Sequence, residues 1–397
     1  MNTAQVETRF AGRMRTLRPS CVREILGAAG GDVISFAGGL PSPRLFPVEA
    51  IAEASARVLR DQGRFALQYS STEGYPPLRE YVAQHALRRR GVTASADDVL
   101  ITNGSQQALD LVGKVFLDSG DRVLMESPAY LSAIQAFELY QPRFVPVRLN
   151  SDGLDPYLLA EALQRESPKL VYLVPNFQNP TGVCYSEENR CAVAHLLRMH
   201  NAVLVEDDPY RELRFEGVDL PPVHRHPDPW AVLMGTFSKV LSPGLRMGWV
   251  YTDAATRSHL VVAKQASDLC SSDLTQRILY ECLTRFDLER HIAALCRAYR
   301  SQRDRMLEHL RTRFPPGTGY TTPQGGMFIW VTLPAGVSAE RLLAAALRRG
   351  VAFAPGRSFY PGRPELNTLR LNFTHPDDAA MDRGMTILAE EARRLTD

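Results

Sequence analysis

The sequence predicts an α/β protein with a large domain built on a mostly parallel sheet and a smaller α/β domain after it. Seven short apolar runs alternate with segments of helical periodicity between residues 99 and 252. Continuous apolar runs are typical of strands that helices cover on both faces. After residue 283 the order of elements changes, and a chain of 397 residues is long enough for two hydrophobic cores.

Composition excludes several classes of protein. Hydrophobic residues make up 45% and charged residues 23% of the chain, as in ordinary globular proteins. A net charge of +2 indicates no nucleic-acid or membrane partner, and no apolar run has the length of a membrane span or a signal peptide. The six cysteines form no CxxC pair and no metal-binding spacing. We therefore expect no bound metal, and a cytoplasmic protein with reduced thiols.

The first hundred residues predict helices joined by polar turns. A short helical pattern covers residues 22–26, and longer ones cover 48–61 and 78–90. Gly38 and Gly39, followed by Leu-Pro, indicate a turn or a close approach of the backbone to something else. We interpret the arginine run at 88–90 as a solvated helix end, where cations suit the helix dipole.

The remaining elements follow from the same periodicities. The predicted strands of the large sheet are residues 99–102, 122–126, 144–147, 170–174, 202–206, 231–236 and 247–252. In the second domain we expect helices at 288–313, 339–349 and 377–395, and strands at 326–331, 351–354 and 369–373.

The turn at 235–246 carries the strongest chemical signal. Lys239 lies between two buried strands, and a buried lysine loses its proton readily and becomes a nucleophile. Thr236, Ser238 and Arg246 share the turn, and hydroxyls with an arginine suit a phosphate. A lysine beside a phosphate site suggests pyridoxal phosphate held as a Schiff base. The alternative is a solvated lysine on a loop rich in glycine and proline.

Other polar residues follow the predicted strands, where active sites of open α/β sheets gather. Ser105 and Gln106 begin a helix whose N-terminus favours a phosphate, unless Ser105 is a plain cap. Tyr130 is either a ring that stacks on a planar cofactor or a core tyrosine. Asn179 lies in a turn, from which its amide can reach a cofactor oxygen.

Three more residues fit a pyridoxal site. Asp207 is either a surface carboxylate or the partner that keeps a pyridine nitrogen protonated. Tyr210 is placed to bond the phenolic oxygen of the ring. Arg370 lies inside an apolar strand and needs a partner, which is either a substrate carboxylate or a structural salt bridge.

In this order and spacing, the motifs resemble those of the fold-type I pyridoxal-phosphate aminotransferases of class I and II. The resemblance runs from about residue 36 to residue 373. Residues 35–41, 130–137 and 235–246 are most similar to the 2-aminoadipate (LysN-like)/kynurenine aminotransferase branch. The resemblance implies a mostly parallel seven-stranded sheet in the large domain. It implies an N-terminal arm and substrate cover at 1–45, a large cofactor-binding domain at 46–285 and a small domain at 286–397.

The resemblance also assigns roles. Lys239, Asp207 and Tyr210 are the expected catalytic residues, with Lys239 moving the proton between the substrate Cα and the cofactor C4′. Asp207 pairs with the pyridine nitrogen, and Asn179 and Tyr210 bind the phenolic oxygen. Tyr130 stacks on the ring. Ser105, Gln106, Thr236, Ser238 and Arg246 bind the phosphate.

The remaining implied contacts concern the substrate and the partner subunit. Arg370 binds the substrate α-carboxylate, and Gly39 and Asn179 lie against the substrate. Arg23, on a helix that begins near Ser20, matches an arginine that meets a distal carboxylate. Tyr69 reaches the phosphate of the neighbouring subunit's cofactor, which implies a homodimer with shared active sites.

The implied activity is transfer of the amino group of an L-amino acid to a 2-oxo acid. The donor is 2-aminoadipate, an aromatic or a branched aliphatic amino acid, and the expected acceptor is 2-oxoglutarate. One alternative is a β-lyase or oxidase with the same cofactor, because the cofactor carries the chemistry. Another is the effector domain of a regulator, but only about 30 residues precede the Gly-Gly motif, too few for a DNA-binding domain.

Overall fold

The computed structural model describes residues 10–15, 17, 19, 24, 25, 27, 33–223 and 230–396. Its centre is an eight-stranded sheet in the order β2-β9-β8-β7-β6-β3-β4-β5. The strands are β2 (Val99–Thr102), β3 (Arg122–Ser127), β4 (Arg143–Asn150), β5 (Gly153–Leu154), β6 (Leu170–Leu173), β7 (Val203–Asp207), β8 (Ala231–Thr236) and β9 (Gly248–Thr252). The seven predicted strands are all present, and the two-residue β5 is an addition at the edge.

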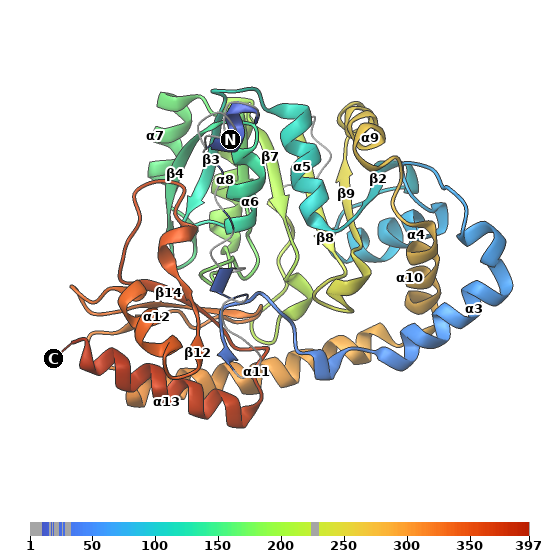
Figure 1. Cartoon of the computed structure of the whole chain (residues 1–397). Coiled ribbons are helices and arrows are strands. Elements are labelled where there is room, and N and C mark those ends of the chain that lie inside the picture. The colour runs from blue at the N-terminus through green and yellow to red at the C-terminus, as the bar shows by residue number, and fades with distance from the viewer. Residues whose placement is uncertain are drawn as a thin grey trace, which may run out of the picture.

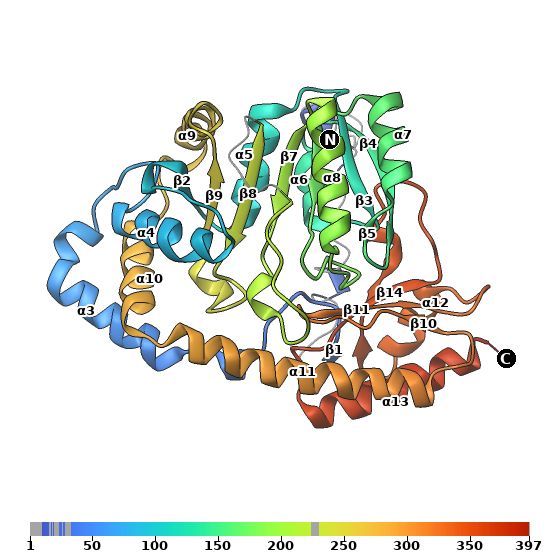
Figure 2. The ribbon, with the colours of Figure 1, turned by 180° about the vertical axis from the view of Figure 1, so that it is seen from behind.

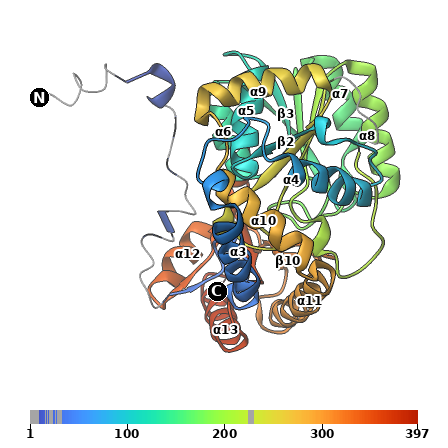
Figure 3. The same cartoon turned by 90° about the vertical axis from the view of Figure 1, so that its right-hand side faces the viewer.

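Five neighbouring strands of this sheet, β8, β7, β6, β3 and β4, run parallel. β9 runs antiparallel to both of its neighbours, β8 and β2, and β5 runs antiparallel to β4. Helices α5 (Ser105–Phe116) and α6 (Leu131–Glu138) cover one face, and α7 (Pro156–Glu166) and α8 (Glu187–His200) cover the other (Figures 2 and 3). The central strands β6, β7 and β8 are buried along their whole length because helices cover both faces of the sheet. The predicted α/β class is confirmed.

A second, four-stranded sheet lies below the first, in the order β10-β11-β14-β13 (Figure 1). Its strands are β10 (Gly319–Tyr320), β11 (Phe328–Thr332), β13 (Ala354–Pro355) and β14 (Thr368–Asn372). A parallel pair, β1 (Ile34–Ser35) and β12 (Val351–Ala352), joins the start of the described chain to this region. The placement of this sheet fits the predicted small domain, whose boundaries at 286 and 397 stay a prediction.

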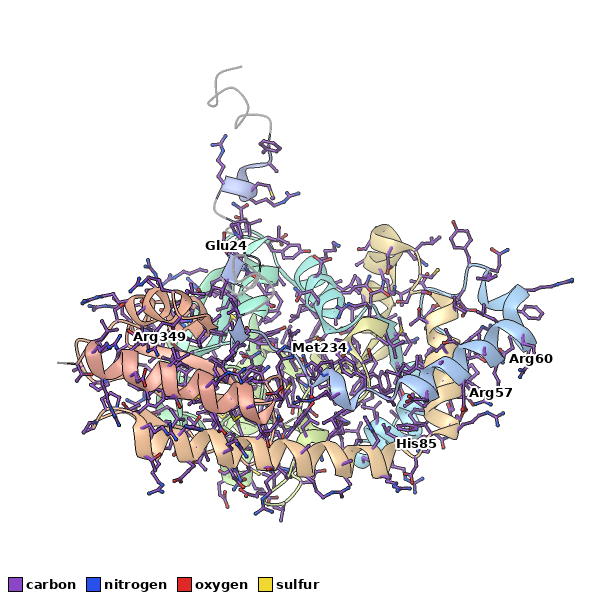
Figure 4. All side chains as sticks on the ribbon, turned by 60° about the horizontal axis from the view of Figure 1, so that its bottom comes forward. Glu24, Arg57, Arg60, His85, Met234 and Arg349 are labelled. Atoms are coloured by element: carbon purple, nitrogen blue, oxygen red, sulfur yellow. The ribbon has the colours of Figure 1, made fainter. Side chains whose placement is uncertain are left out.

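The other helices lie around the two sheets. The long α11 runs along the base from the large sheet to the small one (Figure 1). Figure 4 shows Arg57 and Arg60 of α3 (Val48–Ala66) well away from Met234 of the central strand β8. These helices are α3 (Val48–Ala66), α4 (Pro76–Tyr81) with a π-helical continuation (Val82–Leu87), α9 (Ala254–Asp268), α10 (Asp273–Arg285), α11 (Leu288–Arg313), α12 (Ala339–Leu347) and α13 (Asp378–Arg394).

The described residues also form short 3₁₀ helices. The 3₁₀ helices are Gly12–Arg15, Pro43–Leu45, Ala96–Asp98, Arg211–Leu213, Pro243–Leu245 and Gly356–Phe359. A membrane crossing needs a long apolar helix, and no helix of the described ranges qualifies.

The interpretation of residues 88–90 as a solvated helix end is wrong for Arg90. Its side chain is only 2% exposed and lies 2.8 Å from Asp208 and 2.9 Å from Glu212. Its guanidinium also packs over the ring of Trp249. Arg90 therefore compensates the buried carboxylate of Asp208, which follows β7 at the centre of the sheet.

Candidate active site

A cavity of about 400 Å³ opens at the edge of the large sheet where its parallel strands end. It brings together every predicted cofactor-binding residue except Tyr69. The reason is topological, because the carboxyl ends of parallel strands meet at one edge of a sheet. The lining residues are Ser105, Gln106, Tyr130, Ser132, Val174, Asn179, Asp207, Pro209, Tyr210, Thr236, Ser238, Lys239, Pro243 and Arg246.

Lys239 projects into this cavity from the turn that follows β8. Its ammonium donates to the carbonyl oxygen of Gly39 at 2.9 Å. Burial, together with the positive charges of Arg370 and Arg246, lowers the pKa of Lys239 to about 8. The amine is therefore much closer to its neutral, nucleophilic form at neutral pH than an exposed lysine is.

One end of the cavity is built to receive an anion. Helix α5 begins at Ser105 and aims its free backbone N–H groups at this end. The hydroxyl of Thr236 donates to Ser238 at 2.9 Å, and the guanidinium of Arg246 reaches the carbonyl of Asn103 at 3.4 Å. Donor groups and one positive charge converge here, as a phosphate requires.

The opposite end presents a buried carboxylate, Asp207. Its Oδ2 accepts a hydrogen bond from the hydroxyl of Tyr172 at 2.8 Å, whereas its buried Oδ1 has no hydrogen-bond partner within the part of the chain that the structure describes. Burial raises the pKa of Asp207 to about 7, although the hydrogen bond from Tyr172 opposes this. A buried carboxylate oxygen without a partner fits a ligand that brings a positively charged N–H, such as a protonated pyridine.

A chain of polar contacts joins the small sheet to the cavity. Arg370 of β14 donates to Asn179 at 2.7 Å and to the carbonyl of Ala37 at 2.6 Å. Asn179 in turn donates to the hydroxyl of Tyr210 at 3.3 Å. Burial lowers the pKa of Arg370 to about 10, and its Nε has no hydrogen-bond partner among the described residues. A buried guanidinium that pairs with no carboxylate in this part of the chain suits a carboxylate supplied by a substrate.

The guanidinium of Arg370 is also held by two aromatic rings. It lies 4.2 Å from the ring centre of Phe328 and 4.9 Å from that of Phe359. Cation–π contacts of this kind keep a planar guanidinium in one orientation. Arg370 is therefore positioned before any ligand arrives.

One predicted site residue lies outside the cavity, and another falls outside the described residues. Tyr69 is 80% exposed and does not line the cavity of its own chain. Arg23, and the start of its helix near Ser20, lie outside the described residues. Among the described residues, no cluster of His, Cys, Asp or Glu side chains is arranged to hold a metal ion.

The sequence reasoning did not single out two side chains that support the site. Tyr172 lies in β6, and its hydroxyl donates a hydrogen bond to Asp207. The only sign of this role in the sequence is a single hydroxyl in an otherwise apolar predicted strand. Glu126, near the end of β3, accepts hydrogen bonds from Gln178 and Tyr185, both at 2.8 Å. A charged residue in an apolar run is a similar sign in the sequence, but the hydrogen-bond partners of Glu126 come from a loop far along the chain. It fixes the loop that carries Asn179.

Comparison with known proteins gives a consistent result. The family model for aminotransferase class I and II matches residues 32–388. A 2-aminoadipate transaminase of Thermus thermophilus is 45% identical, over 97% of this chain and 94% of its own. An aromatic-amino-acid aminotransferase of Thermococcus litoralis is 40% identical, over 98% of this chain and 95% of its own.

A solved structure extends this similarity to three dimensions. It is LysN, the α-aminoadipate aminotransferase of Thermus thermophilus, in complex with N-(5′-phosphopyridoxyl)-L-leucine. The superposition has a TM-score of 0.92 at 42% identity and covers 98% of this chain and 99% of that one.

Proposed function

The chain belongs to the class I and II aminotransferase family and is a pyridoxal-phosphate enzyme, and from that premise we propose its substrates and the roles of its residues. The donor is 2-aminoadipate, an aromatic or a branched aliphatic L-amino acid, and the acceptor is 2-oxoglutarate. One observation carries the proposal. The guanidinium of Arg370 is buried, pairs with no carboxylate of the described residues, and donates to Asn179, which lines the cavity that holds Lys239.

The residues of the cavity fit the cofactor. We assign the ring nitrogen to the free Oδ1 of Asp207, because this buried oxygen lacks a partner. We assign the phosphate to the N-terminus of α5 and to Arg246. Thr236, Ser238, Ser105 and Gln106 complete that end, Tyr130 faces the ring, and Asn179 and Tyr210 hold its phenolic oxygen. Bound pyridoxal phosphate supplies an electron sink for the substrate Cα when that atom loses its proton.

The chain supplies positioning and proton transfer. The amine of Lys239, with its lowered pKa, removes the proton from the substrate Cα and returns a proton during the exchange. Arg370 holds the α-carboxylate by two parallel N–H bonds, which fixes the Cα–H bond relative to Lys239. Gly39, whose carbonyl already contacts Lys239, lies where the substrate approaches. We assign Arg23 to a distal carboxylate of the donor.

The choice of donor rests on relatives with dissimilar side-chain preferences. The 2-aminoadipate transaminase and the aromatic-amino-acid aminotransferase are both at least 40% identical to this chain. The bound leucine adduct of LysN adds a branched aliphatic side chain. We infer a side-chain pocket that accepts more than one class of donor.

A donor screen tests the function. The cofactor-loaded enzyme, without an acceptor, is mixed with 2-aminoadipate, glutamate, leucine and phenylalanine, and the absorbance of the bound cofactor is followed. We expect stoichiometric conversion to the aminated cofactor, and its reversal by 2-oxoglutarate. Release of ammonia or pyruvate without an acceptor would contradict transamination and favour a lyase or oxidase.

We further propose a homodimer with shared sites. Phe65, Leu67 and Tyr69 are 72%, 72% and 80% exposed in the single chain. Phe65 lies in the last turn of α3, and the other two lie in the segment directly after it. Apolar side chains gathered in this way on a surface favour a partner interface. A second copy of the chain covers them and receives Tyr69 at its phosphate site.

The free cysteines of the described residues fit a reducing compartment, and we assign the enzyme to the cytoplasm.

Mixing two impaired variants tests the shared site. We expect Tyr69→Ala to lower activity about tenfold or more, through loss of a hydrogen bond to a charged phosphate. When it is unfolded, mixed and refolded with Lys239→Ala, activity should rise well above that of either parent, because a mixed dimer regains one complete site. Each variant refolded with itself is the control. No gain in a mixture shown by mass to contain mixed dimers would place Tyr69 in its own subunit's site.

A further inference from the structure

A second buried lysine lies outside the cavity. Lys264 of α9 is fully buried, and its ammonium lies 2.7 and 2.9 Å from the two carboxylate oxygens of Asp268. Neither residue lines the cavity that holds Lys239. A buried ion pair is weak evidence for stability, because desolvation offsets the attraction. The pair therefore calls for an explanation other than stability alone.

Asp268 contacts more than the lysine. Its Oδ2 accepts hydrogen bonds from the side-chain amides of Asn103 at 2.6 Å and Gln107 at 2.7 Å. The amide oxygen of Gln107 accepts the backbone N–H of Asn103 at 2.8 Å. These contacts form a closed ring between the end of α9 and the loop before α5, two helices that lie side by side (Figure 1).

That loop forms the anion-binding end of the cavity. Gly104, between Asn103 and Ser105, has a φ of +74°, and a Cβ on it would lie 2.8 Å from Nη2 of Arg246. The same guanidinium nitrogen donates to the carbonyl of Asn103 at 3.4 Å. Asn103 is thus held by Asp268 through its side chain and by Arg246 through its backbone.

We propose that Asp268 and Lys264 are positioning residues for the phosphate loop at 103–105. Asp268 fixes Asn103 and Gln107, and these fix the backbone N–H groups that face the phosphate. Lys264 cancels the negative charge of Asp268, which would otherwise repel a phosphate anion through the loop. The inference rests on the proposed phosphate-binding role of this loop.

Loss of either residue should weaken binding of the phosphate group of the ligand and leave the contacts to its ring unchanged. Without Asp268 the two amides are released, and the loop must be ordered again when a phosphate binds. Without Lys264 the carboxylate stays in place but is no longer neutralised. Both changes weaken binding of a phosphate group, and neither alters the contacts of Asp207, Asn179 or Tyr210.

The test measures ligand affinity instead of activity. Cofactor-free Asp268→Ala and Lys264→Met proteins are titrated with pyridoxal phosphate, with inorganic phosphate and with pyridoxal, which has no phosphate. We expect the dissociation constants for the first two ligands to rise about tenfold or more, the scale of one lost hydrogen bond to a charged group. The dissociation constant for pyridoxal should stay the same. An unchanged phosphate affinity, or a parallel loss for pyridoxal, overturns the inference.

Three controls separate the possible failures. Asp253→Ala removes the cap at the other end of α9, where Asp253 accepts from the N–H groups of Ala255 and Thr256; it should lower the melting temperature without changing phosphate affinity. Arg246→Ala must weaken phosphate binding, and if it does not, the proposed phosphate site is wrong. The double variant Lys264→Met/Asp268→Leu leaves no buried charge and removes the acceptor of the two amides of Asn103 and Gln107. It keeps the test valid if a single variant does not fold, and its phosphate affinity should also fall.

Discussion

Replacing Lys239 with alanine is expected to lower the rate of amino-group transfer by three orders of magnitude or more. General acid–base catalysis alone contributes about 10²–10⁴-fold, and in the proposed mechanism the same side chain also attaches the cofactor as its nucleophile. In the cavity, burial together with Arg370 and Arg246 lowers the pKa of Lys239 to about 8. Steady-state turnover with the best donor, and single-turnover conversion of the bound cofactor, measure the loss.

A matched control distinguishes this effect from a general loss of charge. Lys169 is half exposed and pairs with Asp121 at 2.7 Å on the surface, so Lys169→Ala should keep wild-type turnover. Small primary amines added to Lys239→Ala should restore part of the rate, because they supply the missing base in the space the side chain leaves. Turnover near the wild-type level in Lys239→Ala would contradict the mechanism.

Sequence reasoning predicted the parts of the site that depend on local pattern. The apolar run at 231–236 matches β8 (Ala231–Thr236), and the polar residues after β6, β7 and β8 meet at one cavity because those strands run parallel. Periodicity identifies a strand and its end, and topology then brings the ends together.

Long-range pairing limited the prediction elsewhere. Arg90 and Asp208 are 118 residues apart, and Asn103 and Asp268 are 165 apart. An arginine at the end of a helical pattern has the same local signature whether it is solvated or buried, so the interpretation of residues 88–90 favoured the solvated helix end. Tyr172 was overlooked for the same reason, because its partner Asp207 lies on the next strand of the sheet.

Replacing Asp207 with asparagine is expected to lower turnover by about 10²–10³-fold, the loss typical of a preorganised electrostatic group. Asparagine has nearly the same shape, and its oxygen can still accept the hydrogen bond from Tyr172. Its amide, however, carries no charge and cannot hold a proton on a pyridine nitrogen. Turnover at saturating cofactor measures the effect, and a rate near that of the wild type would rule out the role of Asp207.

The same substitution should stabilise the cofactor-free protein at high pH, and the sign follows from the pKa. Burial raises the pKa of Asp207 from 3.8 to about 7. Between these values the folded state binds more protons than the unfolded state, so the free energy of unfolding falls as the pH rises. The favourable contribution is complete below pH 4 and lost above pH 7. Asp207→Asn removes this dependence and should gain on the order of 4 kcal/mol at pH 8, and little at pH 4.

For the neighbouring carboxylate, Asp208, we expect the opposite effect of substitution on stability. Burial alone would raise the pKa of Asp208, but Arg90 and Arg211 hold it below its usual value. Asp208→Asn removes one of the two carboxylate partners of the buried Arg90 and leaves it with Glu212. It should destabilise the protein at pH 8 by roughly 3 kcal/mol, the lower end of the range for breaking a buried ion pair. Urea unfolding of the cofactor-free variants at pH 5 and pH 8 measures both effects. If Asp207→Asn also destabilises at pH 8, Asp207 is not an unpaired carboxylate held ready for a ligand, and its assignment to the ring nitrogen fails.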